Sequence, residues 1–254
     1  MKTPTRGFRR LLPGIALASA LLLTGTGRAA DGWTDLFNGR NLDGWEQRSG
    51  TAKYRVEEGA IVGTTVLKTG NTFLCTKKTY GDFILEFEFK VAAGMNSGVQ
   101  FRSEFYAQET EKEINGKKRK FPADRVFGYQ YEIDPSPRAY TGGVYDEARR
   151  GWLADLKDNP AAQKAFKAGQ WNKARIECRG DQIQTFINGV KAVDLKDGMT
   201  TRGIIERLTI PAFTGFEVSV MMPLASTSAP VPAVVGMAMI GTLERSACVS
   251  RLLG

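Results

Sequence analysis

Gly128-Tyr-Gln-Tyr-Glu-Ile-Asp134 alternates apolar and polar residues, and the same period of two recurs in 82–90 and 96–102. In a β-strand this period places alternate side chains on opposite faces. Tyr131 is therefore expected in the core, while Gln130 shares a face with Glu132. Short alternating strands separated by turn dipeptides such as Asn188-Gly189 predict an all-β, antiparallel two-layer sandwich of jelly-roll type.

One short helix is expected within this β-rich chain. Residues 159–168 place Pro160 at the first helical position and are followed by Gly169, which is a common helix stop. The remaining strand and turn pattern extends over residues 31–205 and predicts a single domain.

The two ends of the chain have a different composition. Residues 1–30 run from a basic start through the apolar segment 11–23 to small residues before Asp31, which is the order of a cleaved signal peptide. The apolar segment is shorter than the roughly 20 residues of a spanning helix. We expect Sec-type export to the periplasm or medium without stable membrane insertion after cleavage, and Arg9-Arg10 leaves a twin-arginine route open. Residues 206–254, rich in Pro, Ser, Ala, Val and Met, are expected to form an atypical and partly irregular tail.

The charge balance does not predict a nucleic-acid partner. The chain carries 35 basic and 27 acidic residues, and removal of the leader leaves a net charge of about +3. The dense basic run Lys117–Lys120 follows the turn signal Asn115-Gly116, so a solvated hairpin tip is the favoured interpretation. Contact with a polyanion is the alternative.

Residue types also limit the chemistry. The chain has no histidine, which excludes Ser-His-Asp and Cys-His catalysis and histidine metal ligands. Two of its three cysteines, Cys75 and Cys178, lie in predicted strands, where they form either buried free thiols or a disulfide. Reactions must therefore depend on carboxylates, Tyr, Lys, Arg or a metal bound through oxygen.

Several ordered motifs resemble those of the 3-keto-disaccharide hydrolase family. They are Trp33-Thr-Asp-Leu-Phe-Asn-Gly-Arg-Asn-Leu-Asp-Gly-Trp45, Asn96-Ser-Gly-Val-Gln-Phe-Arg102, Gly128–Asp134, Gly142-Gly-Val-Tyr-Asp-Glu147 with Gly151-Trp152, Trp171-Asn172 and Phe186-Ile-Asn-Gly189. The resemblance covers about residues 31–205 and implies a concanavalin-like β-sandwich that acts on small 3-keto-glycosides. After Ile205 the chain departs from the family pattern.

This implied activity assigns roles to the polar residues of the motifs. Removal of the proton beside a keto group needs a base, an acid at the leaving oxygen and a group that stabilises the enolate. We assign Glu132, Glu147 and Arg102 to catalysis. Substrate contacts are expected from Gln100, Gln130, Tyr145, Asp146 and Trp152. Glu132 and Asp134 could hold a divalent metal such as Ca, Mg or Mn.

Simpler interpretations of these residues stay open. Glu132 and Arg102 could form a cross-strand ion pair on a solvated face, Asp134 could stabilise the turn at Pro135, and Trp152 could pack at the rim. The chain as a whole could be a non-catalytic carbohydrate-binding module of the cell envelope, or an interaction domain with an inert polar face.

Overall fold

The computed structural model describes residues 33–66, 68–91, 95–210, 217–221 and 251–253. The expected signal peptide, residues 1–30, lies outside these ranges, as does most of the expected tail, including Cys248. No helix within the described ranges has the length and apolarity needed to cross a bilayer.

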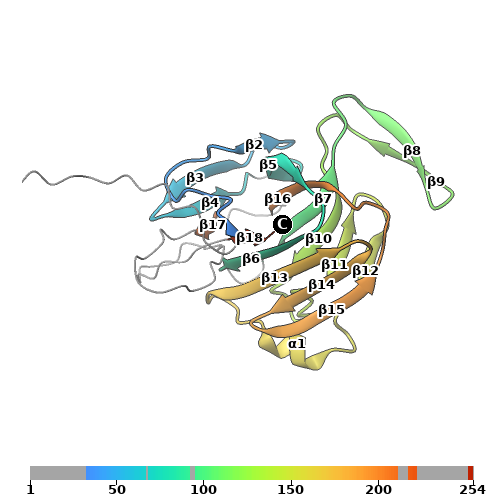
Figure 1. Ribbon diagram of the computed structural model, residues 1–254. Coiled ribbons are helices and arrows are strands. Elements are labelled where there is room, and N and C mark those ends of the chain that lie inside the picture. The colour runs from blue at the N-terminus through green and yellow to red at the C-terminus, as the bar shows by residue number, and fades with distance from the viewer. Residues whose placement is uncertain (1–32, 67, 92–94, 211–216, 222–250, 254) are drawn as a thin grey trace, which may run out of the picture.

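A seven-stranded antiparallel sheet forms one layer of the sandwich (Figure 1). Its strands are, in order across the sheet, β12 (Gly151–Ala154), β11 (Val144–Glu147), β10 (Phe127–Ile133), β7 (Ser97–Glu104), β16 (Gly203–Ile210), β5 (Thr72–Tyr80) and β2 (Trp45–Arg48). β16 lies between β7 and β5 and extends past the domain boundary expected at residue 205.

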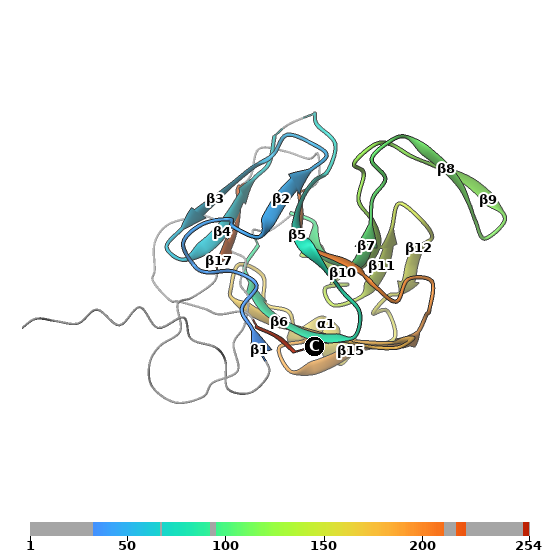
Figure 2. The same ribbon diagram turned by 45° about the horizontal axis from the view of Figure 1, so that its top comes forward.

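The second layer is a six-stranded antiparallel sheet. Its order is β1 (Trp33–Thr34), β18 (Arg251–Leu253), β6 (Phe83–Phe89), β13 (Asn172–Arg179), β14 (Gln182–Ile187) and β15 (Val190–Lys196). Two smaller sheets stand beside these layers (Figure 2): β17 (Glu217–Met221), β4 (Ala60–Thr64) and β3 (Lys53–Glu57), and the hairpin of β8 (Thr110–Ile114) and β9 (Lys117–Phe121).

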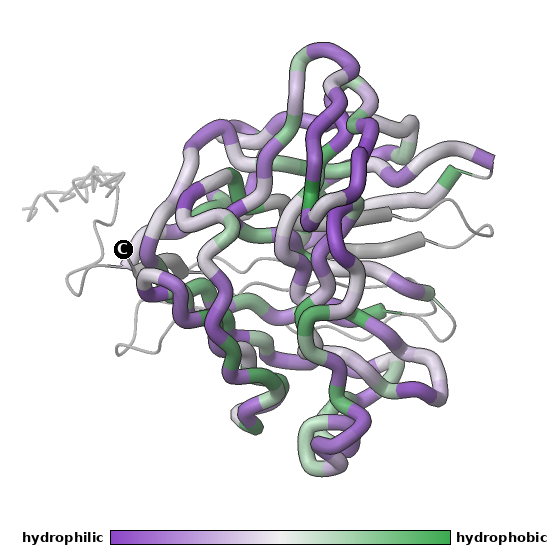
Figure 3. Tube along the Cα trace, turned by 90° about the vertical axis from the view of Figure 1, so that its right-hand side faces the viewer, coloured by the Kyte–Doolittle hydropathy of each residue, from purple (hydrophilic) through white to green (hydrophobic). Residues whose placement is uncertain are grey.

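The core lies between the two main sheets and follows the alternation of the sequence, which is visible along the strands in Figure 3. In β6 the aromatic and leucine side chains Phe83, Leu85, Phe87 and Phe89 are all buried. Tyr131 of the opposite sheet meets Phe87 edge to face at 5.4 Å, and its hydroxyl donates to the carbonyl of Phe186 at 3.1 Å. This geometry confirms the antiparallel β-sandwich and the core position of Tyr131.

The local predictions are confirmed with small changes at element ends. Helix α1 runs over Pro160–Ala165, shorter than expected, and the Asn159 side chain caps it by accepting from Ala162 N at 3.1 Å. Asn115 and Gly116 form the β8–β9 turn with φ of 50° and 72°, as a two-residue hairpin loop requires. Cys75 and Cys178 are buried on different sheets and form no disulfide.

Candidate active site

A row of polar and aromatic residues crosses one face of the seven-stranded sheet. Gln130 of β10 lies opposite Gln100 of β7 on one side and opposite Tyr145 of β11 on the other, and Tyr145 lies opposite Trp152 of β12. Residues directly opposite each other in an antiparallel pair project to the same face. The register therefore brings four of the predicted substrate contacts, Gln100, Gln130, Tyr145 and Trp152, into one row.

Glu132 lies beside this row on the same face and is only 5% exposed. Its two carboxylate oxygens accept from amides, Oε1 from Asn96 Nδ2 at 2.5 Å and Oε2 from Gln130 Nε2 at 2.8 Å. Burial raises the pKa of Glu132, although these two amide hydrogen bonds oppose the shift. No ion pair to Glu132 exists among the described residues, so this carboxyl group is set to accept a proton more readily than a solvated one.

A glycine makes room for this arrangement. Gly98 lies opposite Glu132, and a Cβ atom at Gly98 would stand 2.5 Å from Cδ of Gln130. Any side chain at position 98 would therefore displace the Gln130 amide that binds Glu132.

The amide of Gln100 is an exception to the usual pairing of buried polar groups. Gln100 is fully buried, yet neither its Nε2 nor its Oε1 has a hydrogen-bond partner within the part of the chain that the structure describes. A buried amide without partners costs about 1–3 kcal/mol. Such a group next to Gln130 is able to bind a hydroxyl or carbonyl of a ligand.

Tyr145 and Glu147 extend the face along β11. The pKa of Tyr145 is raised by burial and then by the charges of Glu147 and Glu132. Burial also raises the pKa of Glu147, even though Arg125 forms an ion pair with it. Both groups therefore hold their protons more strongly than they would in solvent and are able to act as acids.

An aromatic cluster borders the polar row. The Trp152 ring packs edge to face against Tyr145 and against Tyr140, with centroid separations of 5.3 Å in both pairs. The guanidinium of Arg138 lies 5.3 Å from the Trp152 ring centre. Trp152 is thus a half-buried member of the rim rather than of the core, and aromatic rings at such a rim suit the C–H faces of a sugar.

The structure does not bring Arg102 to this face. Arg102 adopts a φ of 47° where the β7–β10 register shifts, and this bulge ends the alternation that placed it with Gln100. Its buried guanidinium instead donates to the carbonyls of Gly81 at 3.1 Å and Gly180 at 2.6 Å, and pairs with Asp82 at 3.0 Å. Arg102 joins the two sheets, so its predicted catalytic position is wrong, and the ion pair with Glu132 that was the alternative interpretation does not form either.

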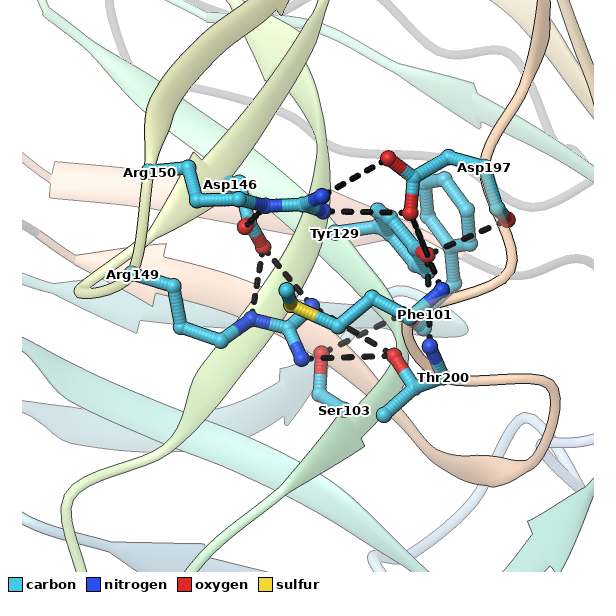
Figure 4. A network of polar contacts seen from close by, with 9 residues as sticks. Phe101, Ser103, Tyr129, Asp146, Arg149, Arg150, Asp197 and Thr200 are labelled. Carbon is cyan, nitrogen blue, oxygen red and sulfur yellow. Dashed lines mark hydrogen bonds and ion pairs between the residues drawn. The ribbon is translucent and has the colours of Figure 1, made fainter. Parts of the chain in front are cut away.

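Asp146 also points away from the row, because it lies opposite Tyr129, whose ring is in the core. Figure 4 shows its carboxylate bound by both Arg149 and Arg150, while Arg150 continues to Asp197. Asp146 is fully buried and its charge is compensated by two guanidinium groups. The structure gives it a role in holding the β11–β12 turn and leaves it no contact with a ligand on the opposite face.

The sequence model of the 3-keto-alpha-glucoside-1,2-lyase-like domain matches residues 32–217 of this chain. The chain belongs to that family. A 3-keto-disaccharide hydrolase from Bacteroides thetaiotaomicron is 32% identical over 163 residues, which are 58% of this chain and 52% of that relative. The match thus spans about half the length of the curated relative.

Solved structures of low sequence identity are also similar to the chain. Carbohydrate binding module CBM66 from Bacillus subtilis has a TM-score of 0.49 at 15% identity, covering 78% of this chain and 98% of its own. A β-glucanase from Bacillus licheniformis has a TM-score of 0.43 at 13% identity, covering 71% of this chain and 85% of its own.

Within the family domain, the predicted metal ligands do not fit a divalent ion. Asp134 Oδ2 accepts from Arg138 Nε at 2.7 Å and Oδ1 from Ser136 N at 3.1 Å, so its side chain stabilises the turn after β10. Burial opposes ionisation of Asp134, but the hydrogen bonds from Ser136 and Arg138 outweigh it and lower its pKa. The oxygens of Glu132 are bound to amides, and nowhere in the described ranges do three or more His, Cys, Asp or Glu side chains converge as metal ligands.

Four further residues of the site were not predicted: Asn96, Arg125, Arg138 and Tyr140. Asn96 directly precedes β7 in a motif that the sequence analysis quotes, so its polar character was a usable signal. Arg125, Arg138 and Tyr140 lie in loops, whose positions a strand period does not determine.

Proposed function

We propose that this protein is an enzyme that cleaves 3-keto-glycosides by elimination and hydration. The observation that carries this proposal is the environment of Glu132. It is a buried carboxyl group with a raised pKa that is held by amides alone, and it lies beside the orphan amide of Gln100. Membership of the family supports the substrate class.

In the proposed reaction Glu132 is the base. The keto group at C3 acidifies the hydrogen on C2, and the Glu132 carboxylate takes this proton as the C2–H electron pair moves into an enolate. Re-formation of the C3 carbonyl expels the glycosidic oxygen from C1, which leaves a C1=C2 double bond conjugated with the carbonyl. The leaving oxygen takes a proton from an acid of the site. Water then adds to C1 and returns a proton to that acid, while Glu132 returns its proton to C2, so that acid and base are both regenerated.

Tyr145 is the better placed of the two proton donors. It lies opposite Gln130, two residues along β10 from Glu132, whereas Glu147 lies opposite Gly128, four residues away. At about 3.4 Å per residue these offsets are about 7 Å and about 14 Å along the strand. The C2 hydrogen and the leaving oxygen sit on adjacent carbons, so the nearer donor fits the geometry, and we assign Glu147 the role of keeping Tyr145 protonated.

The amides and aromatic rings would bind the sugar. Gln100 offers an unused donor and an unused acceptor, which suits a sugar hydroxyl or the enolate oxygen. This replaces Arg102 as the group next to the developing negative charge. The Trp152 rim would contact the C–H face of the sugar or of its aglycone. Export through residues 1–30 would bring the enzyme to glycosides outside the cytoplasm.

A non-catalytic carbohydrate-binding module is the alternative function, and the aromatic rim around Trp152 is the observation that favours it. Such a module needs the rings and the amides but no base, so it predicts that Glu132 contributes to affinity alone. The two functions therefore differ in a single measurable property, which is turnover.

The deciding experiment follows release of the aglycone from phenyl 3-keto-β- and 3-keto-α-glucosides by the full chain and by Glu132→Gln. The amide keeps the shape of the side chain but cannot accept the C2 proton. We expect Glu132→Gln to reduce turnover by about 100-fold or more. Glu104→Gln, an exposed change on the neighbouring strand β7, is the control and should keep full activity.

Two results would decide against the proposal. Binding of either glucoside without turnover by the wild-type chain would leave the module function in its place. Equal turnover by the wild type and Glu132→Gln would remove Glu132 from the reaction.

A further inference from the structure

The β8–β9 hairpin separates its charges between its two faces. Register pairs Glu111 with Lys120 and Glu113 with Lys118 on one face. Lys118 forms an ion pair with Glu111 at 3.1 Å, and Lys120 with Glu109 at 3.7 Å. This face is charge-balanced, as is usual for a solvated hairpin.

The other face of the hairpin carries cations only. Its three register pairs are Thr110 with Phe121, Lys112 with Arg119 and Ile114 with Lys117. Lys112 and Arg119 are like charges directly opposite each other, which is an unfavourable cross-strand arrangement. Within the described part of the chain none of the three cations on this face has an ion pair or a hydrogen bond from its side chain, and all three are exposed.

Packing at the base of the hairpin fixes which face turns toward the sandwich. Phe121 is buried and packs against Phe127, the first residue of β10, at 4.4 Å and against Tyr106 at 5.7 Å. Arg119 precedes Phe121 by two residues and shares its face. Figure 2 shows the hairpin projecting from the sandwich on the side of β11 and β12.

The cationic face is also electrostatically coupled to the candidate site. The Arg119 charge lowers the pKa of Tyr145, against the larger effects of burial and of the neighbouring carboxylates. Two carboxylates near the site have other cationic partners, because Glu147 pairs with Arg125 and Asp134 pairs with Arg138. Lys112, Lys117 and Arg119 therefore form a positive face of the hairpin, coupled to Tyr145 through Arg119, and no described acid of this chain forms an ion pair with these three cations.

We propose that this cationic face, Lys112, Lys117 and Arg119, binds an anionic group on the aglycone of the substrate. The inference rests on the proposed function and names its substrate class: 3-keto-glycosides whose leaving part carries a carboxylate or a phosphate. Guanidinium and ammonium groups bind both anions, with Arg favouring the two-oxygen contact. The unfavourable pairing of Lys112 with Arg119 becomes favourable once an anion lies between them.

The test compares three glucosides that share one sugar. The probes are the 3-keto-glucosides of phenol, of 4-hydroxybenzoate and of 4-hydroxyphenyl phosphate, and equilibrium binding to the full chain is measured by calorimetry together with KM. We expect one or both anionic probes to bind about fivefold more tightly than the phenyl probe, with an advantage that falls as salt is added. The preferred anion identifies whether a carboxylate or a phosphate is the natural group.

Variants on the two faces of the hairpin separate the proposal from a general charge effect. Arg119→Glu should weaken binding of the preferred anionic probe by about tenfold and leave the phenyl probe within about twofold. Lys112→Ala should act in the same direction with a smaller effect. Lys118→Ala, on the charge-balanced face, is the matched control and should change neither probe.

Each outcome decides the question. Equal affinity for all three probes, or an Arg119→Glu effect shared by the phenyl probe, would overturn the proposal. An effect of Lys118→Ala as large as that of Arg119→Glu would also overturn it, because nonspecific attraction would then suffice. Selective binding of an anionic probe without turnover of any probe would keep the anion site and reject the proposed enzyme.

Discussion

The two faces of the seven-stranded sheet each hold a buried carboxylate, but the partners of these carboxylates differ. On the face turned from the core, Glu132 is held by two neutral amides next to an unpaired Gln100, and burial raises its pKa. On the other face, Asp146 is bound by Arg149 and Arg150 within the network of Figure 4. The first face retains unused hydrogen-bonding capacity, whereas the second is saturated.

Whether a buried polar group is fully paired distinguishes a binding residue from a structural one better than its residue type does. A buried charge that is fully paired holds elements together and offers nothing to a ligand. A buried polar group without a partner is tolerated where a ligand supplies the missing hydrogen bonds. By this criterion Arg102, with three donor contacts and no exposed surface, belongs with Asp146, although its sequence position suggests a catalytic group.

The largest expected effect comes from the saturated face. Asp146→Asn removes the charge that compensates Arg149, whose side chain is 2% exposed. We expect the free energy of unfolding to fall by about 3–5 kcal/mol, as for other broken buried ion pairs. Urea denaturation measures this loss, and Asp158→Asn, at an exposed position between β12 and α1, is the control.

The comparison of faces also predicts what Asp146→Asn leaves intact. Turnover for each folded molecule should stay within about tenfold of wild type, because Asp146 does not reach the face that carries Glu132. A stable Asp146→Asn protein with abolished turnover would place Asp146 in the reaction and contradict the division between the faces.

Glu132→Gln is expected to do the reverse. Turnover falls by about 100-fold or more, while the midpoint of thermal unfolding changes little. The amide removes the cost of a buried carboxylate, but its N–H replaces one of the two oxygens that accept from Asn96 and Gln130. Differential scanning calorimetry beside the kinetic assay gives both values. A protein that loses stability together with activity would show that Glu132 supports the fold rather than the chemistry.

Gln100→Leu is a smaller test of the same face. Leucine has a similar volume and no polar atoms, so stability should be unchanged or higher by about 1 kcal/mol once the orphan amide is gone. Affinity for a 3-keto-glucoside should fall about tenfold if the amide binds the sugar. Gln108→Leu, at an exposed loop position, is the matched control. Unchanged affinity in Gln100→Leu would leave the amide without a ligand.

The sequence predicted the parts of this arrangement that depend on period. Alternation placed Tyr131 in the core and Gln130 with Glu132, and the structure confirms both positions. Alternation failed at Arg102, because a β-bulge gives Arg102 a positive φ and turns its side chain to the other face. Position 102 holds no glycine, so the sequence does not indicate this backbone conformation.

The partners of the buried carboxylates could not be predicted from the strand period. Alternation places Asp146 on the face opposite Tyr145 and Glu147. Its partners Arg149 and Arg150 lie in the turn between β11 and β12, and the folded hairpin brings their guanidinium groups to the Asp146 carboxylate. Asn96 and Arg125 reach their carboxylates from outside the strand pattern in the same way. Period determines the face of a strand residue, whereas partners depend on tertiary contacts.

The smallest expected effect is a pH dependence of stability that distinguishes the two kinds of carboxylate. Because the pKa of Glu132 is raised above its ordinary value of 4.5 in the folded state, the folded protein binds more protons there than the unfolded chain. The free energy of unfolding therefore decreases as pH rises from 4.5 through the folded pKa. Asp134 and Asp197, whose pKa values are lowered by their hydrogen bonds and arginine partners despite burial, contribute stability that is lost as pH falls below 3.8.

Comparison with Glu132→Gln isolates the first of these two contributions. The difference in the free energy of unfolding between wild type and variant should grow in favour of the variant as pH rises above 4.5, since only the wild type then ionises a buried carboxyl group. Glu104→Gln, exposed on the same sheet, is the control for the loss of one carboxyl group. A Glu132→Gln difference that does not change with pH would mean that Glu132 is as easily ionised in the folded protein as in the unfolded chain, and the base would then lack the raised pKa on which its assignment depends.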